Sequence, residues 1–154
     1  MNQQKINFLK KDFPEMLRKL SAEQKGNWGK MNAQQMVEHI TDTLRVTNGK
    51  KFQKKELTPE QTEKARSFFL SDKPFRENTT NHLLPEIPYA CTNSNITEAI
   101  KEMEAELGEF FSKFENNTNQ KSVNPFAGEF NFDEWVHLLH KHFLHHAKQF
   151  SLID

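Results

Sequence analysis

Hydrophobic residues recur with a helical period over most of the chain, and polar segments separate the periodic stretches. The main stretches begin with Asn or Thr followed three residues later by Gln or Glu. This pattern is typical of helix N-termini, because the two side chains cap each other's backbone amides. The four starts are Asn32 with Gln35, Thr58 with Gln61, Asn95 with Glu98, and Asn131 with Glu134. The pattern predicts helices over about 33–47, 59–70, 95–114 and 131–150.

The first 20 residues predict a further helical segment. Apolar residues gather in two groups, around Phe8 and around Leu17, and Pro14 lies between them. A proline fits the first turn of a helix but interrupts a helix interior. The sequence therefore predicts a first helix that Pro14 either kinks or restarts, and it leaves both possibilities open.

Two connections interrupt the helical pattern. Residues 71–94 contain three prolines and many polar residues, and an ordered connection of this length often serves a function or covers an edge of the core. Residues 124–128 form a second connection, and no stretch shows sustained strand alternation. The fold class predicted is all-α: one domain over 1–154, a four-helix bundle with a short extra helix and a long connection between its second and third helices.

Composition fits a single domain with an aromatic core. The chain has 154 residues, of which only 35% are hydrophobic, but 14 Phe and 2 Trp supply bulk. Lys plus Arg and Asp plus Glu both number 21, so the sequence lacks the excess of basic residues that binding to nucleic acid or an acidic membrane surface requires. Neither partner is expected.

The single cysteine, Cys91, excludes an intrachain disulfide. The first 13 residues lack the apolar core of a signal peptide, and no apolar run approaches the ~20 residues that span a bilayer. A reducing, cytoplasmic setting is therefore the expected location.

Five of the seven histidines fall in the last predicted helix. Its apolar stripe contains Trp135, Leu139 and Phe143, and a turn of ~100° per residue separates the histidines by face. His142 and His146 lie on the core side, four residues apart, at the spacing with which one helix can bind one metal ion through two imidazoles. The remaining three fall on the opposite face or the flanks and are expected to be surface or flank residues: His137, His140 and His145.

A third ligand is available from the helix predicted over 33–47. His39 lies at the edge of its apolar face, so the hypothesis is a site of His39, His142 and His146 with an open position for water or substrate. Neutral imidazoles suit Zn, Ni or Fe, so the ligand set does not name the metal. Asp42 lies one turn beyond His39 and is a candidate to support a ligand or carry a proton, whereas Glu38 is expected to be solvated.

Other interpretations of these residues stay open at this point. A single histidine on an apolar face is more often a hydrogen-bonded core residue than a ligand, and a His-rich helix can be a surface tract that collects metal without function. His82, in the long connection, is an outside candidate for a ligand. Tyr89 could reach a pocket but is expected to pack, and Cys91 has no adjacent histidine motif that would mark it as a nucleophile.

Several motifs together resemble the DinB-like, YfiT-like family of metal-dependent proteins, and in particular a subgroup of unknown function. The motifs cover both ends of the chain, and they are Trp28-Gly29-Lys30-Met31, Gln35-Met36-Val37-Glu38-His39, Asn124-Pro125-Phe126-Ala127-Gly128, Glu134-Trp135 and His142-Phe143-Leu144-His145-His146-Ala147-Lys148-Gln149.

The resemblance implies a four-helix bundle that binds one divalent ion through His39, His142 and His146. Many family members continue the last ligand as His-Arg-Gly-Gln; here Gln149 is kept as a candidate to support the site, while Ala147-Lys148 replaces the Arg-Gly pair. Characterised relatives include thiol-dependent S-transferases and isomerases, and the resemblance therefore implies a small-molecule substrate such as a low-molecular-weight thiol.

Two hypotheses of function follow. The first is a metal-dependent enzyme that transfers a thiol to an electrophile or hydrolyses its substrate. The second is a non-catalytic bundle whose histidines bind metal structurally or sense it, and whose exposed face forms a homodimer.

Overall fold

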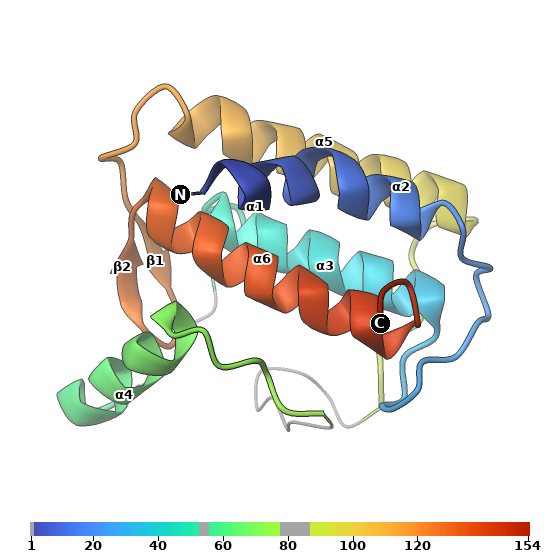
Figure 1. Ribbon diagram of the computed structural model, residues 1–154, viewed down its shortest axis with the longest axis horizontal. Coiled ribbons are helices and arrows are strands. Elements are labelled where there is room, and N and C mark those ends of the chain that lie inside the picture. The colour runs from blue at the N-terminus through green and yellow to red at the C-terminus, as the bar shows by residue number, and fades with distance from the viewer. Residues whose placement is uncertain (1, 53–55, 78–86) are drawn as a thin grey trace.

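The computed structural model of the protein describes residues 2–52, 56–77 and 87–154 and is mostly helical (Figure 1). The helical class predicted from the sequence is therefore confirmed. The helices are α1 (Gln3–Asn7), the π-helical turn η1 (Phe8–Asp12), α2 (Phe13–Leu17), α3 (Ala33–Thr47), α4 (Pro59–Leu70), α5 (Ile96–Phe114) and α6 (Phe132–Gln149).

The first helical segment continues through Pro14 by changing its hydrogen-bond register. The amide of Phe13 donates to the carbonyl of Phe8, five residues back, so a π-turn precedes the proline. Pro14 then lies in the first turn of α2, where no amide donor is needed. The segment therefore runs on as one helical rod, and its interruption is the inserted π-turn (Figure 1).

The helix starts predicted from capping signals are confirmed. Asn32, Thr58 and Asn131 each accept a hydrogen bond from the backbone amide three residues on, and the matching Gln or Glu side chain accepts one from the capping residue's own amide. Asn95 accepts a hydrogen bond from the amide of Glu98, but the Glu98 carboxylate accepts from Lys101 and returns no bond to Asn95. The capping bonds satisfy amides that would otherwise lack partners at the helix ends.

A short hairpin, which the sequence did not predict, precedes α6. Strands β1 (Ser122–Asn124) and β2 (Gly128–Phe130) pair antiparallel, with Val123 opposite Glu129. The side chain of Asn124 accepts hydrogen bonds from the amides of Phe126 and Ala127 and so holds the turn between them. Strands of three residues are too short to show a periodic pattern, so only the connection at 124–128 was predicted correctly.

Aromatic side chains fill the core between α5, α3, α6 and the first helical rod. The largest fully buried side chains include Trp135, Phe13, Phe110, Phe114, Phe130, Phe143 and Phe150. Each such ring contributes roughly 1.5–3 kcal/mol by leaving water. This packing fixes α3 and α6, which lie side by side in Figure 1.

Helix α4 lies outside this core, and none of its residues is fully buried. Its C-terminal end is held by α6: Lys141 donates to the carbonyl of Phe68 at 2.6 Å, and His137 Nε2 donates to the carbonyl of Ser71 at 2.8 Å. The described residues of the connection that follows, 71–77 and 87–94, contain no helix or strand, as predicted. Residues 78–86, which include the candidate ligand His82, lie outside the described part of the chain.

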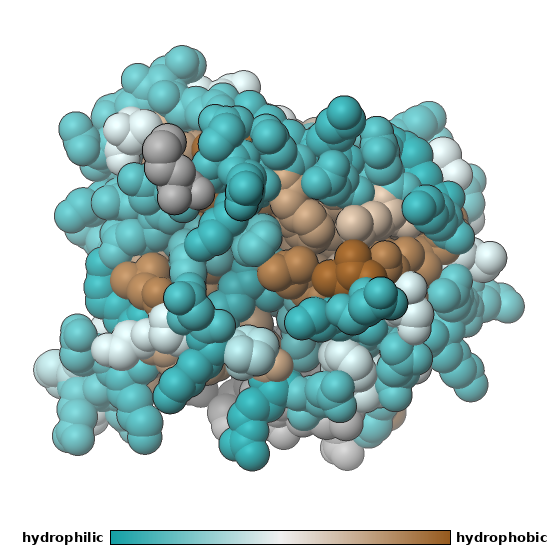
Figure 2. All heavy atoms as spheres, in the orientation of Figure 1, coloured by the Kyte–Doolittle hydropathy of each residue, from teal (hydrophilic) through white to brown (hydrophobic). Residues whose placement is uncertain are grey.

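The face of the molecule in Figure 2 is mostly hydrophilic, with hydrophobic side chains gathered in a band between the positions of α2 and α6. Partly buried side chains pack against the core from outside, among them Met16, Leu144 and Leu152. Among the described residues, no helix combines the length and the hydrophobicity needed to cross a bilayer.

Candidate metal centre

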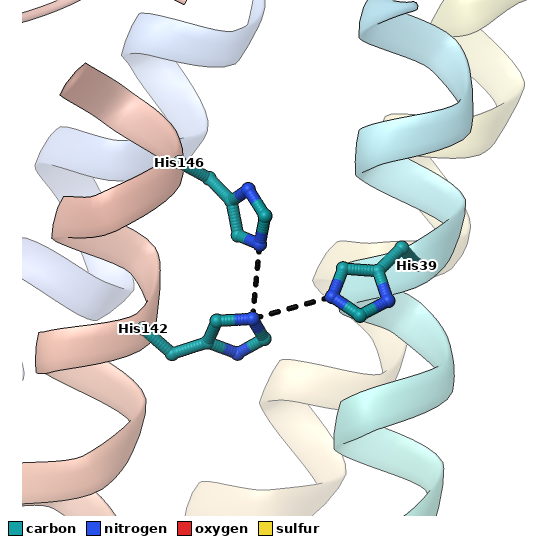
Figure 3. A group of neighbouring side chains, drawn as sticks. All are labelled: His39, His142 and His146. Carbon is teal, nitrogen blue, oxygen red and sulfur yellow. Dashed lines mark hydrogen bonds between the residues drawn. The ribbon is translucent and has the colours of Figure 1, made fainter. Parts of the chain in front are cut away.

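Three histidines predicted from the sequence meet between α3 and α6 (Figure 3). The Nε2 atom of His142 lies 3.2 Å from that of His39 and 2.9 Å from that of His146. One ligand nitrogen from each of the three lies within 4.8 Å of the others. His146 is only 4% exposed, and the other two rings are half-buried.

The three converging nitrogens cannot satisfy one another by hydrogen bonds alone. Each Nε2 carries either one proton or one lone pair, so His142 Nε2 can form only one proper bond with its two neighbours. A cation at the centre would instead accept all three lone pairs. Nitrogens bound tetrahedrally at 2.0–2.1 Å lie about 3.3 Å apart, which is within a few tenths of an ångström of the separations found here.

A chain of hydrogen bonds fixes the orientation of His146. The side-chain amide of Gln149 donates from Nε2 to the carbonyl of Trp28 at 2.9 Å, so its Oε1 faces the ring. His146 Nδ1 lies 2.7 Å from that Oε1 and must therefore be the protonated nitrogen. The lone pair of the neutral ring is then on Nε2 and points into the cluster. Metal-binding histidines are usually held in this way, by an acceptor that takes the proton of the other ring nitrogen.

The segment from Lys25 to Asn32 supplies the carbonyl that begins this chain. It closes on itself through a bridge between those two residues, and Asn27 N donates to the carbonyl of Gln149 at 2.7 Å. Gly29 has φ of 80°, and a Cβ there would lie 2.8 Å from Gln149 Nε2. A residue without a side chain is therefore required where the turn passes Gln149.

Burial keeps the cluster neutral. It lowers the pKa of His39 to about 4, against the opposing effect of the Asp42 carboxylate. Burial also lowers the pKa values of His142 and His146 well below the ordinary value, and the neighbouring histidines add to the effect. Deprotonated imidazoles are the form that binds metal, so the site is ready for an ion at neutral pH.

Asp42 lies at the cavity wall and does not bond directly to a histidine in the described part of the chain. Its two oxygens accept hydrogen bonds from Arg45 at 3.1 Å and Lys51 at 3.3 Å. Its effect on His39 is electrostatic. Of the two supporting residues predicted, Gln149 therefore contacts a cluster histidine and Asp42 does not.

The three remaining histidines of α6 lie outside the cluster. His137 accepts from Lys5 on Nδ1, and His140 packs its ring edge against Phe8 at 5.1 Å. His145 differs, because its ring lies 5.4 Å from that of Trp28 and it lines the cavity beside the cluster. The helical wheel placed it on a flank, and it gave no sign that the loop before α3 would enclose it.

Glu38 is not the solvated carboxylate that was expected. It accepts hydrogen bonds from the amide and hydroxyl of Thr92 at 2.7 and 3.0 Å and from the amide of Asn93 at 3.2 Å. Burial opposes its ionisation, but these hydrogen bonds lower its pKa overall. Glu38 therefore fastens the end of the long connection to α3, a contact that the sequence does not show.

The cluster opens onto a cavity of about 560 Å³. Tyr89 and Phe75 line it from the long connection, and Gln35 holds Tyr89 by donating to its carbonyl at 3.0 Å. Cys91 is exposed and does not line the cavity, and burial raises the pKa of its thiol. A cavity of this size suits a small molecule.

Comparison of the chain with models of known protein families, with curated proteins and with solved structures found no match.

Proposed function

We propose that the protein is a metal-dependent enzyme built as a DinB-like four-helix bundle, in which His39, His142 and His146 hold one divalent ion. The observation that carries the proposal is the convergence of three neutral Nε2 atoms, 2.9 and 3.2 Å apart, at the wall of a small-molecule cavity. Three histidines from the protein leave the fourth position of a tetrahedral ion open, as in catalytic zinc sites.

The residues around the site have distinct tasks in this proposal. Gln149 holds His146 as the Nδ1–H tautomer, and the carbonyl of Trp28 holds Gln149. Phe75 packs its ring against His142 and His145 and limits the access of water. A bound divalent ion supplies Lewis-acid chemistry, since it lowers the pKa of a water molecule or thiol in its fourth position.

The substrate proposed is a small molecule, and the reaction is transfer of a low-molecular-weight thiol to an electrophile, or hydrolysis. The imidazole set suits Zn, Ni or Fe. Thiol chemistry also fits the reducing, cytoplasmic setting expected from the sequence.

A second candidate function is structural or sensory metal binding, with or without dimerisation. It is favoured by the origin of the ligands, because one histidine comes from α3 and two come from α6. An ion there would join two helices across the cavity between them. A fourth ligand from the protein would support this function, and an exchangeable position would support the enzyme.

Metal analysis of protein purified without a His tag tests the site. We expect about one equivalent of metal in the wild type and its loss in His39→Ala and in His142→Ala. His140→Ala is the matched control, since this ring is on the same helix but packs against Phe8 instead. Retention of stoichiometric metal by both site variants would exclude the three-histidine site.

Turnover separates the enzyme from the binder. The metal-loaded protein is assayed with a panel of electrophiles and low-molecular-weight thiols, and His142→Ala serves as the inactive reference. Thiol-dependent or hydrolytic turnover supports the enzyme. The coordination shell is measured by X-ray absorption spectroscopy. Absence of turnover, with a fourth protein ligand on the ion, supports structural or sensory metal binding.

A further inference from the structure

The cavity extends beyond the three histidines toward the hairpin. Helices α3 and α6 run antiparallel, so the residues after His39 and those before His142 line the same end (Figure 1). We call this end the apolar arm, and it is lined by Val46, Phe68, Phe69, Phe126, Trp135 and Leu139. Trp135 precedes His142 by seven positions on α6, a helical rise of about 10 Å, which we take as the length of the arm.

The walls of the arm come from separate elements and are packed together. The rings of Phe69 on α4 and Phe126 in the hairpin turn meet edge to face at 6.1 Å. Trp135 is 2% exposed and packs against Phe130 at 5.2 Å. Val46, Phe68, Phe69 and Phe126 are partly exposed and form the surface of the arm, and Trp135 and Leu139 are buried behind them. This hydrophobic surface is suited to an alkyl or aryl group.

Two hydroxyls and one amide oxygen beside the arm are already engaged, whereas the buried indole Nε1 of Trp135 has no hydrogen-bond partner among the described residues. Thr43 Oγ1 donates to the carbonyl of His39 at 3.2 Å, and Thr47 Oγ1 donates to that of Thr43 at 3.0 Å. The side-chain oxygen of Asn124 accepts from the two amides of the hairpin turn. These bonds turn the polar atoms toward the protein backbone, so a ligand in the arm gains mainly from leaving water.

The charged residues of the cavity are unlike those of the whole chain. The chain has equal numbers of basic and acidic residues, but among the described residues that line the cavity three are basic, Lys30, Lys51 and Arg76, and one is a carboxylate, Asp42. Lys51 bonds to Asp42, which is one turn from His39, so a cation lies near the metal centre. A concave surface with a surplus of positive charge attracts anions.

We propose that the cavity binds an anionic amphiphile, with its alkyl or aryl tail in the apolar arm and its anionic head beside Lys51 and the three histidines. The assignment of this molecule as a substrate rests on the proposed function. The binding of this molecule does not depend on the proposed function, because the arm and the cations belong to the protein itself.

A series of straight-chain carboxylates tests the arm. Hexanoate, octanoate, decanoate and dodecanoate are titrated into metal-free protein by calorimetry, and the fluorescence of Trp28 and Trp135, which both line the cavity, gives a second signal. Affinity should rise by about fourfold per methylene until the arm is full and then level off. An affinity that does not depend on chain length overturns the arm.

Head-group analogues test the charge. Octanoate should bind at least tenfold more tightly than 1-octanol, and octylammonium should bind more weakly than either. Lys51→Met should remove most of the preference for octanoate over octanol. Lys50→Met is the matched control, since the neighbouring lysine pairs with Glu106 and Glu109 outside the cavity. Equal affinity for the acid and the alcohol overturns the anionic head.

A blocking variant locates the binding. Ala65 lines the cavity from α4, whereas Ser67 on the same helix is exposed. Ala65→Trp should lower decanoate affinity at least tenfold and shift the best length to a shorter chain, and Ser67→Trp should change neither. The same loss in both variants overturns the location.

Repeating the titrations with zinc-loaded protein separates this inference from the proposed function. If affinity rises with chain length but the protein does not bind zinc, the result supports the arm and contradicts the metal centre. Stoichiometric zinc with no chain-length dependence supports the metal centre and contradicts the arm.

Discussion

At the scale of single residues, Gln149 links the three-histidine cluster to the loop before α3. It is 3% exposed, and it accepts from His146 while donating to Trp28. An amide can perform both tasks through a single planar group, because its oxygen accepts and its nitrogen donates. This explains why the residue sits at the end of α6 with a glycine-containing turn around it.

We expect Gln149→Leu to weaken metal binding by about 10–100-fold, because His146 loses the acceptor that selects its tautomer and orients its ring. Competition with a coloured chelator measures the change. Lys148→Met is the control, since this neighbouring side chain is exposed. Equal affinity in wild type and Gln149→Leu would contradict the orienting role.

Gly29→Ala should destabilise the protein by about 1–2 kcal/mol, because the backbone is in the left-handed region and the new Cβ would press on Gln149. Gly108→Ala, in the interior of α5 with nothing within 4 Å of a Cβ, should instead stabilise it by about 0.5–1 kcal/mol. Urea denaturation gives both values. Opposite signs are expected, and a stabilising Gly29→Ala would show that the turn is not constrained.

At the scale of elements, local signals were sufficient for the helices and insufficient for their contacts. The starts at Asn32, Thr58 and Asn131 follow from bonds between residues three apart, so the sequence shows them. The π-turn before Pro14 shifts the backbone hydrogen bonds by one residue so that the helix can continue through the proline. The sequence could indicate only that the helix is interrupted there. The strands of the hairpin are local but too short to show a period, and the fastening role of Glu38 depends on partners distant in the sequence.

The attachment of α4 to α6 gives a prediction at this scale. The ammonium of Lys141 donates to Phe68 O at 2.6 Å and lies 3.9 Å from the ring centre of Phe68, and burial lowers its pKa. A hydrogen bond from a charged group contributes about 1.5–3 kcal/mol. In Lys141→Met, amide hydrogen exchange should therefore accelerate in α4 while α5 remains protected. Lys101→Met, at an exposed ion pair on α5, should leave α4 unchanged.

At the scale of the whole molecule, the candidate site combines two histidines that the pattern of one helix predicts with a third that only the packing of two helices brings close. The helical phase of α6 selects His142 and His146 from five histidines, because burial of one face is a local property. His39 becomes their neighbour only because α3 and α6 lie antiparallel and in register, which no single segment encodes. His145 joins the cavity wall for the same reason and was therefore missed.

Buried neutral histidines should make the metal-free protein sensitive to acid. His39 and His140 both have pKa values lowered to about 4 by burial, against 6.5 as reference. Between these values the unfolded chain binds protons that the folded chain does not, so stability falls as pH decreases from about 6.5 to 4. The slope is at most about 1.4 kcal/mol per pH unit for each such histidine. Urea denaturation of metal-free protein should show this fall, and His140→Gln should reduce it.

Metal binding should stabilise the whole fold, because its ligands come from two helices that lie far apart in the sequence. At a free metal concentration 100 times the dissociation constant, the gain is about 2.7 kcal/mol. For a chain of this size, that corresponds to a rise of roughly 5–11 °C in Tm. Calorimetric scans with and without zinc measure it, and His39→Ala should abolish the rise although both α6 ligands remain. A rise that persists in His39→Ala would place the ion on α6 alone, where it could not join the two helices.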